Sequence, residues 1–297
     1  MRKSAVFLLS TVLVLTSLSA WAEEKATPDK AEPTLVLATF GSTQDERDTL
    51  FEAVSAKVRQ RYPDVRIERA WTSKHYSKTR ANPENAPNLA VVLGRLGAEG
   101  DTVVAVQSLH VVPGYEYDTV KEITERFANM PKLMERTACG APLLGSSHDA
   151  EALAEILIAA NPVKAGEAVI LVGHGAHNGS GSLAYPALEN ALKRRNPYYF
   201  VDNLEGEGGL EPILASLRKS GVKRVYLMPL LTTLGDHARN DIFGKEAGSR
   251  QSRIAASGFT VVPVQKSLAD LPDVAGIYAE HAVEALKSLG FAPKGGQ

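Results

Sequence analysis

Cysteine is almost absent from this chain, and so are strong net charge and long apolar runs. A single cysteine, Cys139, excludes an internal disulfide. Its thiol is expected to fill apolar space, with metal ligation as the alternative. A net charge of -1 gives no electrostatic footprint for nucleic acid or an anionic membrane surface. No apolar run after residue 22 reaches the roughly 20 residues of a membrane-spanning helix, so we expect no stable membrane insertion.

The N-terminal residues 1–22 have the pattern of a cleavable export signal. A basic start at residues 2–3 precedes an apolar stretch over 5–18, and Ala-Trp-Ala at 20–22 supplies a small-x-small cleavage pattern. Residues 23–33 are polar and contain proline, as expected of a flexible leader. The sequence therefore predicts a periplasmic mature protein, and the alternative is an uncleaved membrane anchor.

Hydrophobic stretches and amphipathic segments alternate along the rest of the chain. Strands are expected over 34–41, 65–71, 102–112, 168–173, 199–204, 223–231 and 259–264. A first helix is expected from an N-cap at Ser42 or Thr43 until Pro63 stops it. Further helices are expected over 88–96, 120–127, 149–160, 185–195, 209–219, 239–256 and 273–289. Alternating βαβ units imply parallel sheets with helices on both faces. The pattern predicts two Rossmann-like α/β lobes around a cleft, over residues 34–146 and 147–297.

Two histidines stand at the ends of two of the expected buried strands. His174 follows the apolar run 168–172 and has glycine on both sides, and His237 follows the run that begins at Val225. Ligands of open α/β sheets bind beyond the carboxyl ends of the strands, so both rings should face one crevice. Neutral imidazole is the commonest protein metal ligand and also accepts protons near neutrality. The pair predicts a site that handles a metal and accepts protons.

A carboxylate follows the strand between these two. Glu205 lies about one βα unit, roughly 30 residues, from each histidine. Three successive strands would then bring two imidazoles and a carboxylate to one rim, a set that suits a divalent first-row metal. Glu207 is the alternative carboxylate. Asp236 is expected either to orient the neighbouring imidazole of His237 or to cap the following helix.

Five segments together resemble a known family. They are FGS at 40–42, SLHVVPGYEYD at 108–118, GHGAH at 173–177, LEG at 204–206 and MPLLTTLGDHARNDIFG at 228–244. They resemble the anaerobic, CbiK-type sirohydrochlorin cobaltochelatases, which are class II chelatases. The resemblance extends from Thr34 to the C-terminus, and GDHARND is its most specific part. Thr-Thr-Leu before Gly235 and GEGG at 206–209 depart from the usual family pattern.

The resemblance implies both the reaction and the residues that perform it. The implied activity is ATP-independent insertion of Co²⁺, with Fe²⁺ as the alternative metal, into sirohydrochlorin with loss of two protons. The implied metal ligands are His174, Glu205 and His237, and His174 is also the expected proton acceptor. Residues expected to contact the macrocycle and its carboxylates are Phe40, Gly41, Ser42, Gly173, Gly175, His177 and Asp236.

A different class of function competes with this interpretation. A periplasmic carrier that binds a tetrapyrrole or a metal without chemistry would also suit an exported two-lobed α/β protein. The presence of all three expected ligands favours the enzyme, because a carrier needs no proton acceptor facing the macrocycle. If subunits form a homo-oligomer, we expect non-covalent contacts through apolar helix faces. No internal disulfide is expected, since Cys139 has no partner within the chain.

Overall fold

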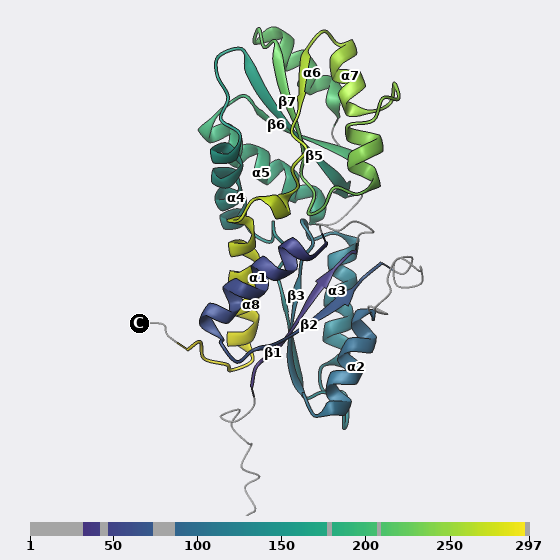
Figure 1. Cartoon of the computed structure of the whole chain (residues 1–297), viewed down its shortest axis with the longest axis vertical. Coiled ribbons are helices and arrows are strands. Elements are labelled where there is room, and N and C mark those ends of the chain that lie inside the picture. The colour runs from purple at the N-terminus through teal and green to yellow at the C-terminus, as the bar shows by residue number, and fades with distance from the viewer. Residues whose placement is uncertain (1–31, 42–46, 74–86, 177–179, 207–208, 295–297) are drawn as a thin grey trace, which may run out of the picture. The chain divides into compact units, whose positions relative to one another are not determined.

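Two four-stranded parallel sheets form the framework of the described part of the chain (Figure 1). The first has the order β2-β1-β3-β4 and contains β1 (Thr34–Thr39), β2 (Arg66–Trp71), β3 (Val103–Ser108) and β4 (Arg136–Gly140). The second has the order β6-β5-β7-β8 and contains β5 (Glu167–Ala176), β6 (Tyr199–Gly206), β7 (Arg224–Pro229) and β8 (Thr260–Pro263). Every strand pairing within them is parallel, which confirms the predicted pair of Rossmann-like lobes.

This computed structural model describes residues 32–41, 47–73, 87–176, 180–206 and 209–294. The predicted signal peptide and most of the predicted leader, together with Ser42, His177 and Glu207, lie outside these ranges. The α-helices are α1 (Arg47–Arg61), α2 (Leu89–Glu99), α3 (Tyr115–Phe127), α4 (Ser147–Ala160), α5 (Gly181–Arg195), α6 (Leu210–Lys219), α7 (Arg250–Ala256) and α8 (Val274–Ser288). A π-helical turn, η2 (His237–Ile242), and a 3₁₀ turn, η3 (Leu268–Asp270), complete the described helices. None of the helices in these ranges combines the length and apolarity needed to cross a membrane.

Both faces of each sheet are buried, which explains the unbroken apolar runs of the central strands. In β1, Leu35 and Leu37 pack with α1 and α8, whereas the alternating residues Val36 and Ala38 pack with α2 and α3 (Figure 1). This is the period-2 alternation of a strand covered on both sides. The cluster around Leu35 also includes Leu171 of β5, so one continuous apolar core joins the two sheets.

The last helix packs on the sheet formed by the N-terminal half of the chain. α8 contacts β3, β4 and α1, while α4, which follows β4, packs against α5. Tyr278 of α8 is fully buried and donates its hydroxyl hydrogen bond to the carbonyls of Leu109 and His110, at 3.2 Å each. Burial raises the pKa of the Tyr278 hydroxyl, so it remains a donor. The lobe boundary between residues 146 and 147 stays a prediction. By sequence α8 belongs to the predicted second lobe, but it packs on the sheet of the first.

Two expected elements differ from the structure, and one strand was not expected. The continuous helix expected over 239–256 is wrong, because η2 ends at Ile242 and α7 begins only after its N-cap, Ser249. The expected strand over 102–112 ends at Ser108. The strand β4 had no counterpart among the expected elements, because its five residues, Arg-Thr-Ala-Cys-Gly, contain no long apolar run.

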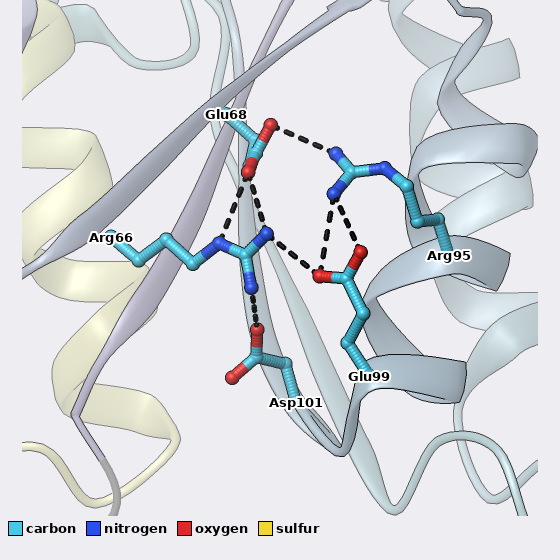
Figure 2. Close-up of polar contacts among 5 residues, drawn as sticks. All are labelled: Arg66, Glu68, Arg95, Glu99 and Asp101. Carbon is cyan, nitrogen blue, oxygen red and sulfur yellow. Dashed lines mark hydrogen bonds and ion pairs between the residues drawn. The ribbon is translucent and has the colours of Figure 1, made fainter.

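A network of charged side chains ties the edge strand β2 to α2 and the loop after it (Figure 2). Arg66 donates to Glu68 at 2.9 Å, Glu99 at 2.8 Å and Asp101 at 2.6 Å. Arg95 closes the network by donating to Glu68 at 2.9 Å and Glu99 at 3.1 Å. Hydrogen bonds from Arg66 and then Arg95 lower the pKa of Glu99, so the stability linked to this carboxyl is lost as the pH falls through its lowered pKa.

We predict that Arg66→Ala lowers the midpoint of thermal unfolding by about 2–4 °C, because three carboxylates lose a shared partner. The loss should shrink at high salt, which screens exposed charges. Arg126→Ala is the matched control, since within the described residues Arg126 pairs with Glu122 alone, on the exposed face of α3 at 2.6 Å. Calorimetric scans at low and high salt test the difference, and equal shifts for both variants would contradict a cooperative network.

Candidate metal-binding site

The three predicted metal ligands lie at the carboxyl ends of adjacent strands of the second sheet. His174 stands near the end of β5, Glu205 near the end of β6, and His237 opens η2 beyond β7. The sheet order β6-β5-β7-β8 places β5 beside β7, and the chain connections leave these two strands in opposite directions along the sheet. Such a switch point is where open α/β sheets bind ligands. The fold therefore brings both imidazoles to the expected location.

The two imidazoles face one another directly. Their Nε2 atoms are 3.3 Å apart, and their ring centroids are separated by 4.7 Å with perpendicular planes. Two nitrogen ligands placed 2.0–2.1 Å from a tetrahedral metal lie roughly 3.3 Å from one another. About half of each side chain is exposed, 47% for His174 and 51% for His237. The pair is thus spaced for one metal ion and open to a substrate.

Glu205 lies on the other side of the His174 ring. Its Oε2 is 3.9 Å from His174 Nδ1, and 45% of the side chain is exposed. Among the described residues, no group of three or more His, Cys, Asp or Glu side chains is arranged to hold a metal at once. The structure therefore brings the three residues together, while their assignment as a three-ligand set stays a prediction.

Close backbone packing sets the positions of His174 and Glu205. Gly175 pairs with Glu205 in the β5–β6 register and has a φ of +100°. A Cβ atom at Gly175 would lie 2.0 Å from the Glu205 carbonyl oxygen, a distance that no side chain can occupy. Gly206 repeats this arrangement with a φ of +85° and a would-be Cβ 2.6 Å from Ala176 O. Glycine is required here because it lets the two strand ends approach closely.

A buried tyrosine, Tyr185, packs against the glycines on either side of His174. It was not singled out from the sequence. Tyr185 of α5 accepts a hydrogen bond from Gly175 N–H at 3.3 Å, and its ring occupies the space beside Gly173. Burial raises the pKa of Tyr185 to about 12, so the hydroxyl is neutral at physiological pH. The spacing to His174 gave no signal, because Tyr185 looks like an ordinary core residue of an amphipathic helix.

The carboxylate that contacts His237 is also different from the one expected. Asp241 Oδ2 lies 2.7 Å from His237 Nδ1, four residues along η2. Asp236 precedes the turn and makes no side-chain capping hydrogen bond, so the expected helix-capping role is wrong for it. A His-x-x-x-Asp spacing within the GDHARND segment was the available signal, since side chains four residues apart lie on one helical face.

The predicted macrocycle contacts in the first lobe are described only in part. Phe40 follows β1 and is 50% exposed, and Gly41 has a φ of +98°, almost the same as Gly175 in the second lobe. The loop after β3 reaches the segment that follows His174, where Ser180 Oγ donates to Pro113 O at 3.4 Å. The loop after β3 therefore lies beside the segment that follows His174, while the contacts of Phe40 and Gly41 with a substrate stay a prediction.

Two other groups that could ligate a metal are occupied elsewhere. The ring of His110 interacts through Nδ1 with Ser108 Oγ at 2.8 Å and through Nε2 with Thr72 Oγ1 at 3.3 Å. Burial lowers the pKa of His110 to about 4, so the ring is neutral. Burial raises the pKa of Cys139 to about 12, which keeps it a thiol and favours the apolar packing role over metal ligation.

The fold and the facing imidazoles define a two-lobed protein of the chelatase type. Two solved structures share the fold. SirB from Bacillus subtilis with Fe³⁺ is 14% identical with a TM-score of 0.60, and the match covers 88% of this chain and 99% of that chain. The sirohydrochlorin chelatase SirB from Bacillus subtilis subspecies spizizenii in complex with cobalt is 14% identical with a TM-score of 0.55, and the match covers the same shares, 88% and 99%. The family described as cobalt chelatase (CbiK) matches residues 33–287. The chain therefore belongs to the CbiK cobalt chelatase family.

Curated relatives agree with this assignment. The chain is 34% identical to the sirohydrochlorin cobaltochelatase CbiKC of Nitratidesulfovibrio vulgaris strain Hildenborough, over 86% of this chain and 91% of that protein. It is 28% identical to the sirohydrochlorin cobaltochelatase of Salmonella typhimurium strain LT2, over 85% of this chain and 96% of that protein. Both alignments span nearly the whole length of the relatives, so the two lobes are compared together.

Proposed function

We propose that the protein is a sirohydrochlorin cobaltochelatase, which inserts Co²⁺ into sirohydrochlorin without ATP and releases two protons. The observation that carries this proposal is the pair of Nε2 atoms 3.3 Å apart at the switch point of the second sheet. The names of both curated relatives support the same substrate and metal. They also favour catalysis over the alternative of a carrier. Fe²⁺ insertion is part of the proposal as a second activity.

The hydrogen-bond partners determine which nitrogen of each ring can face the metal. Asp241 accepts from His237 Nδ1–H, so His237 Nε2 presents its lone pair. In the absence of metal, His174 Nε2–H therefore donates to His237 Nε2. Binding of Co²⁺ between the rings requires His174 Nε2 to lose that proton, and Glu205 near Nδ1 favours the tautomer that carries the proton on Nδ1. Rotation of the exposed Glu205 side chain would bring its carboxylate to the metal as a third ligand.

Insertion also requires two protons to leave the pyrrole nitrogens of the macrocycle. An imidazole that has released Co²⁺ to the macrocycle is again a free base beside the pyrrole nitrogens. We propose that His174 is this proton acceptor. Its position at the open end of β5 lets the proton pass on to solvent. In the balanced reaction, Co²⁺ replaces the two pyrrole N–H protons of the macrocycle, which gives the cobalt complex and two protons. The exposed Phe40 ring supplies an apolar surface for the macrocycle, and backbone N–H groups near Gly175 are proposed to bind its carboxylates.

The direct test is anaerobic incubation of the purified protein with sirohydrochlorin and either Co²⁺ or Fe²⁺, followed by absorbance. We expect the spectrum to convert to that of the metal complex, faster than without protein, in the absence of ATP. Saturable binding of sirohydrochlorin with no acceleration of metal insertion would instead identify a carrier.

A paired substitution tests the carboxylate assignment. We predict that Glu205→Gln weakens Co²⁺ binding by about tenfold or more, because the amide has no charge to favour the cation or the Nδ1–H tautomer of His174. Glu207→Gln is the matched control, since it removes a like charge two residues away. Calorimetric titration of each variant with Co²⁺ measures the difference. A larger loss for Glu207→Gln would transfer the role to that residue.

We also propose that the protein is exported to the periplasm and cleaved after Ala22, on the strength of the basic, apolar and small-residue pattern of residues 1–22. N-terminal sequencing of protein from the periplasmic fraction should begin near Glu23. Retention of Met1 on protein found in the membrane or cytoplasmic fraction would contradict export. Any homo-oligomer should remain associated without disulfides, which non-reducing electrophoresis and light scattering test.

A further inference from the structure

His237 and Asp241 form a pair that the structure holds in place from behind. The pair occupies positions one and five of η2, and its Nδ1–Oδ2 distance is 2.7 Å. The residues that follow each of them, Ala238 and Ile242, are buried at 1% and 0% exposure. One side of the turn is thus anchored in the core, while the side that carries His237 and Asp241 is exposed.

The end of the turn is fixed just as firmly. The turn closes with a π-type hydrogen bond from Phe243 N–H to Ala238 O at 2.9 Å. A Cβ atom at Gly244 would lie 2.1 Å from Asn240 O, so the chain passes directly over the end of the turn. Ser249 is 2% exposed and donates to Gly244 O at 2.6 Å. Asp241 therefore extends from a backbone that has little freedom to move.

The contact determines both the orientation and the chemistry of the imidazole. A carboxylate only accepts hydrogen bonds, so the proton of a neutral His237 ring must reside on Nδ1. Nε2 then carries the lone pair, and it is this atom that lies 3.3 Å from His174 Nε2. Without Asp241, the ring could rotate about its exposed side-chain bonds and could carry its proton on Nε2, where it blocks a metal.

We propose that Asp241 is a positioning residue for Co²⁺ capture, acting through His237. This proposal rests on the proposed chelatase function and assigns Asp241 no contact with the metal or the macrocycle. Carboxylates that hold a metal-binding histidine in this way contribute about 10–100-fold to metal affinity. Glu246, an exposed carboxylate five residues further along the chain, has no assigned role at the site and is the matched comparison.

The test compares Asp241→Ala, Asp241→Asn and Glu246→Ala in the full chain, with Co²⁺ and sirohydrochlorin varied independently. Asp241→Ala should raise the KM for Co²⁺ and the calorimetric Kd for Co²⁺ by about 10–100-fold, with the KM for sirohydrochlorin unchanged. Asp241→Asn should recover much of the loss, because its amide oxygen still accepts from Nδ1–H. Glu246→Ala should bind Co²⁺ like the wild type.

Several outcomes would overturn the proposal. Equal Co²⁺ constants for Asp241→Ala and the wild type would show that the contact has no role in capture. Parallel increases in both KM values, together with a lower midpoint of thermal unfolding, would indicate a structural role instead. Equal losses for Glu246→Ala would reduce the effect to negative charge near the site. If the wild-type protein itself does not insert Co²⁺, the proposed function fails, whereas the calorimetric Kd series still tests the positioning role.

Discussion

Replacing His174 with alanine should reduce Co²⁺ insertion by at least about a hundredfold, the lower bound of what a positioned proton acceptor contributes. The variant also loses one of the two Nε2 atoms that lie 3.3 Å apart, so metal capture and deprotonation fail together. The fold should survive, because the side chain is 47% exposed at the end of β5. Initial rates of metal insertion, measured anaerobically at saturating Co²⁺, give the effect.

His148→Ala is the control for this experiment. His148 is exposed near the start of α4, and no hydrogen bond or ion pair to it is described in the structure. Circular dichroism and thermal unfolding of both variants should match the wild type. Turnover near the wild-type rate in His174→Ala at saturating metal would remove His174 from the reaction and leave His237 as the principal imidazole.

The sheets could be predicted from the sequence because their central strands are buried on both faces. The uninterrupted run from Ala168 to Val172 has no other simple explanation than a covered parallel strand. β4 could not be predicted, since it forms an edge and its side chains are small or polar. The break between η2 and α7 was also hidden, because Gly244 and the Ser249 cap lie within an otherwise helical pattern.

Part of the candidate site could likewise be predicted from the sequence, and part could not. His174 and His237 could be predicted from their positions at strand ends, because a polar residue after a long apolar run marks the edge where parallel sheets bind ligands. Tyr185 was missed because its role depends on a tertiary contact of 3.3 Å that spacing alone does not specify. Asp241 was missed although its position four residues after His237 on one helical turn was a usable signal. The position of Glu205 on the Nδ1 side of the His174 ring, at 3.9 Å, is likewise a tertiary feature that sequence spacing does not specify.

The second large effect is expected from a residue with no side chain. Gly175→Ala should lower the free energy of unfolding by about 3 kcal/mol, since the new Cβ meets strain at a φ of +100° and the Glu205 carbonyl at 2.0 Å. The strand ends must separate to accept it, which displaces His174 and Glu205. A shift of about 1 Å in catalytic groups costs roughly a hundredfold in rate. Metal insertion should therefore fall by that factor even in the fraction that remains folded.

Gly166→Ala separates backbone strain from this close approach. Gly166 precedes β5, has a φ of +81°, and has open space where a Cβ would lie. Gly166→Ala should lower the free energy of unfolding by only about 1–2 kcal/mol, because the strain of a left-handed backbone conformation is its sole penalty. Metal insertion should be unchanged. Chemical denaturation and insertion rates of the two variants give the comparison. Equal stability losses and equal rates would show that the Gly175–Glu205 contact adds nothing beyond the strain of a positive φ.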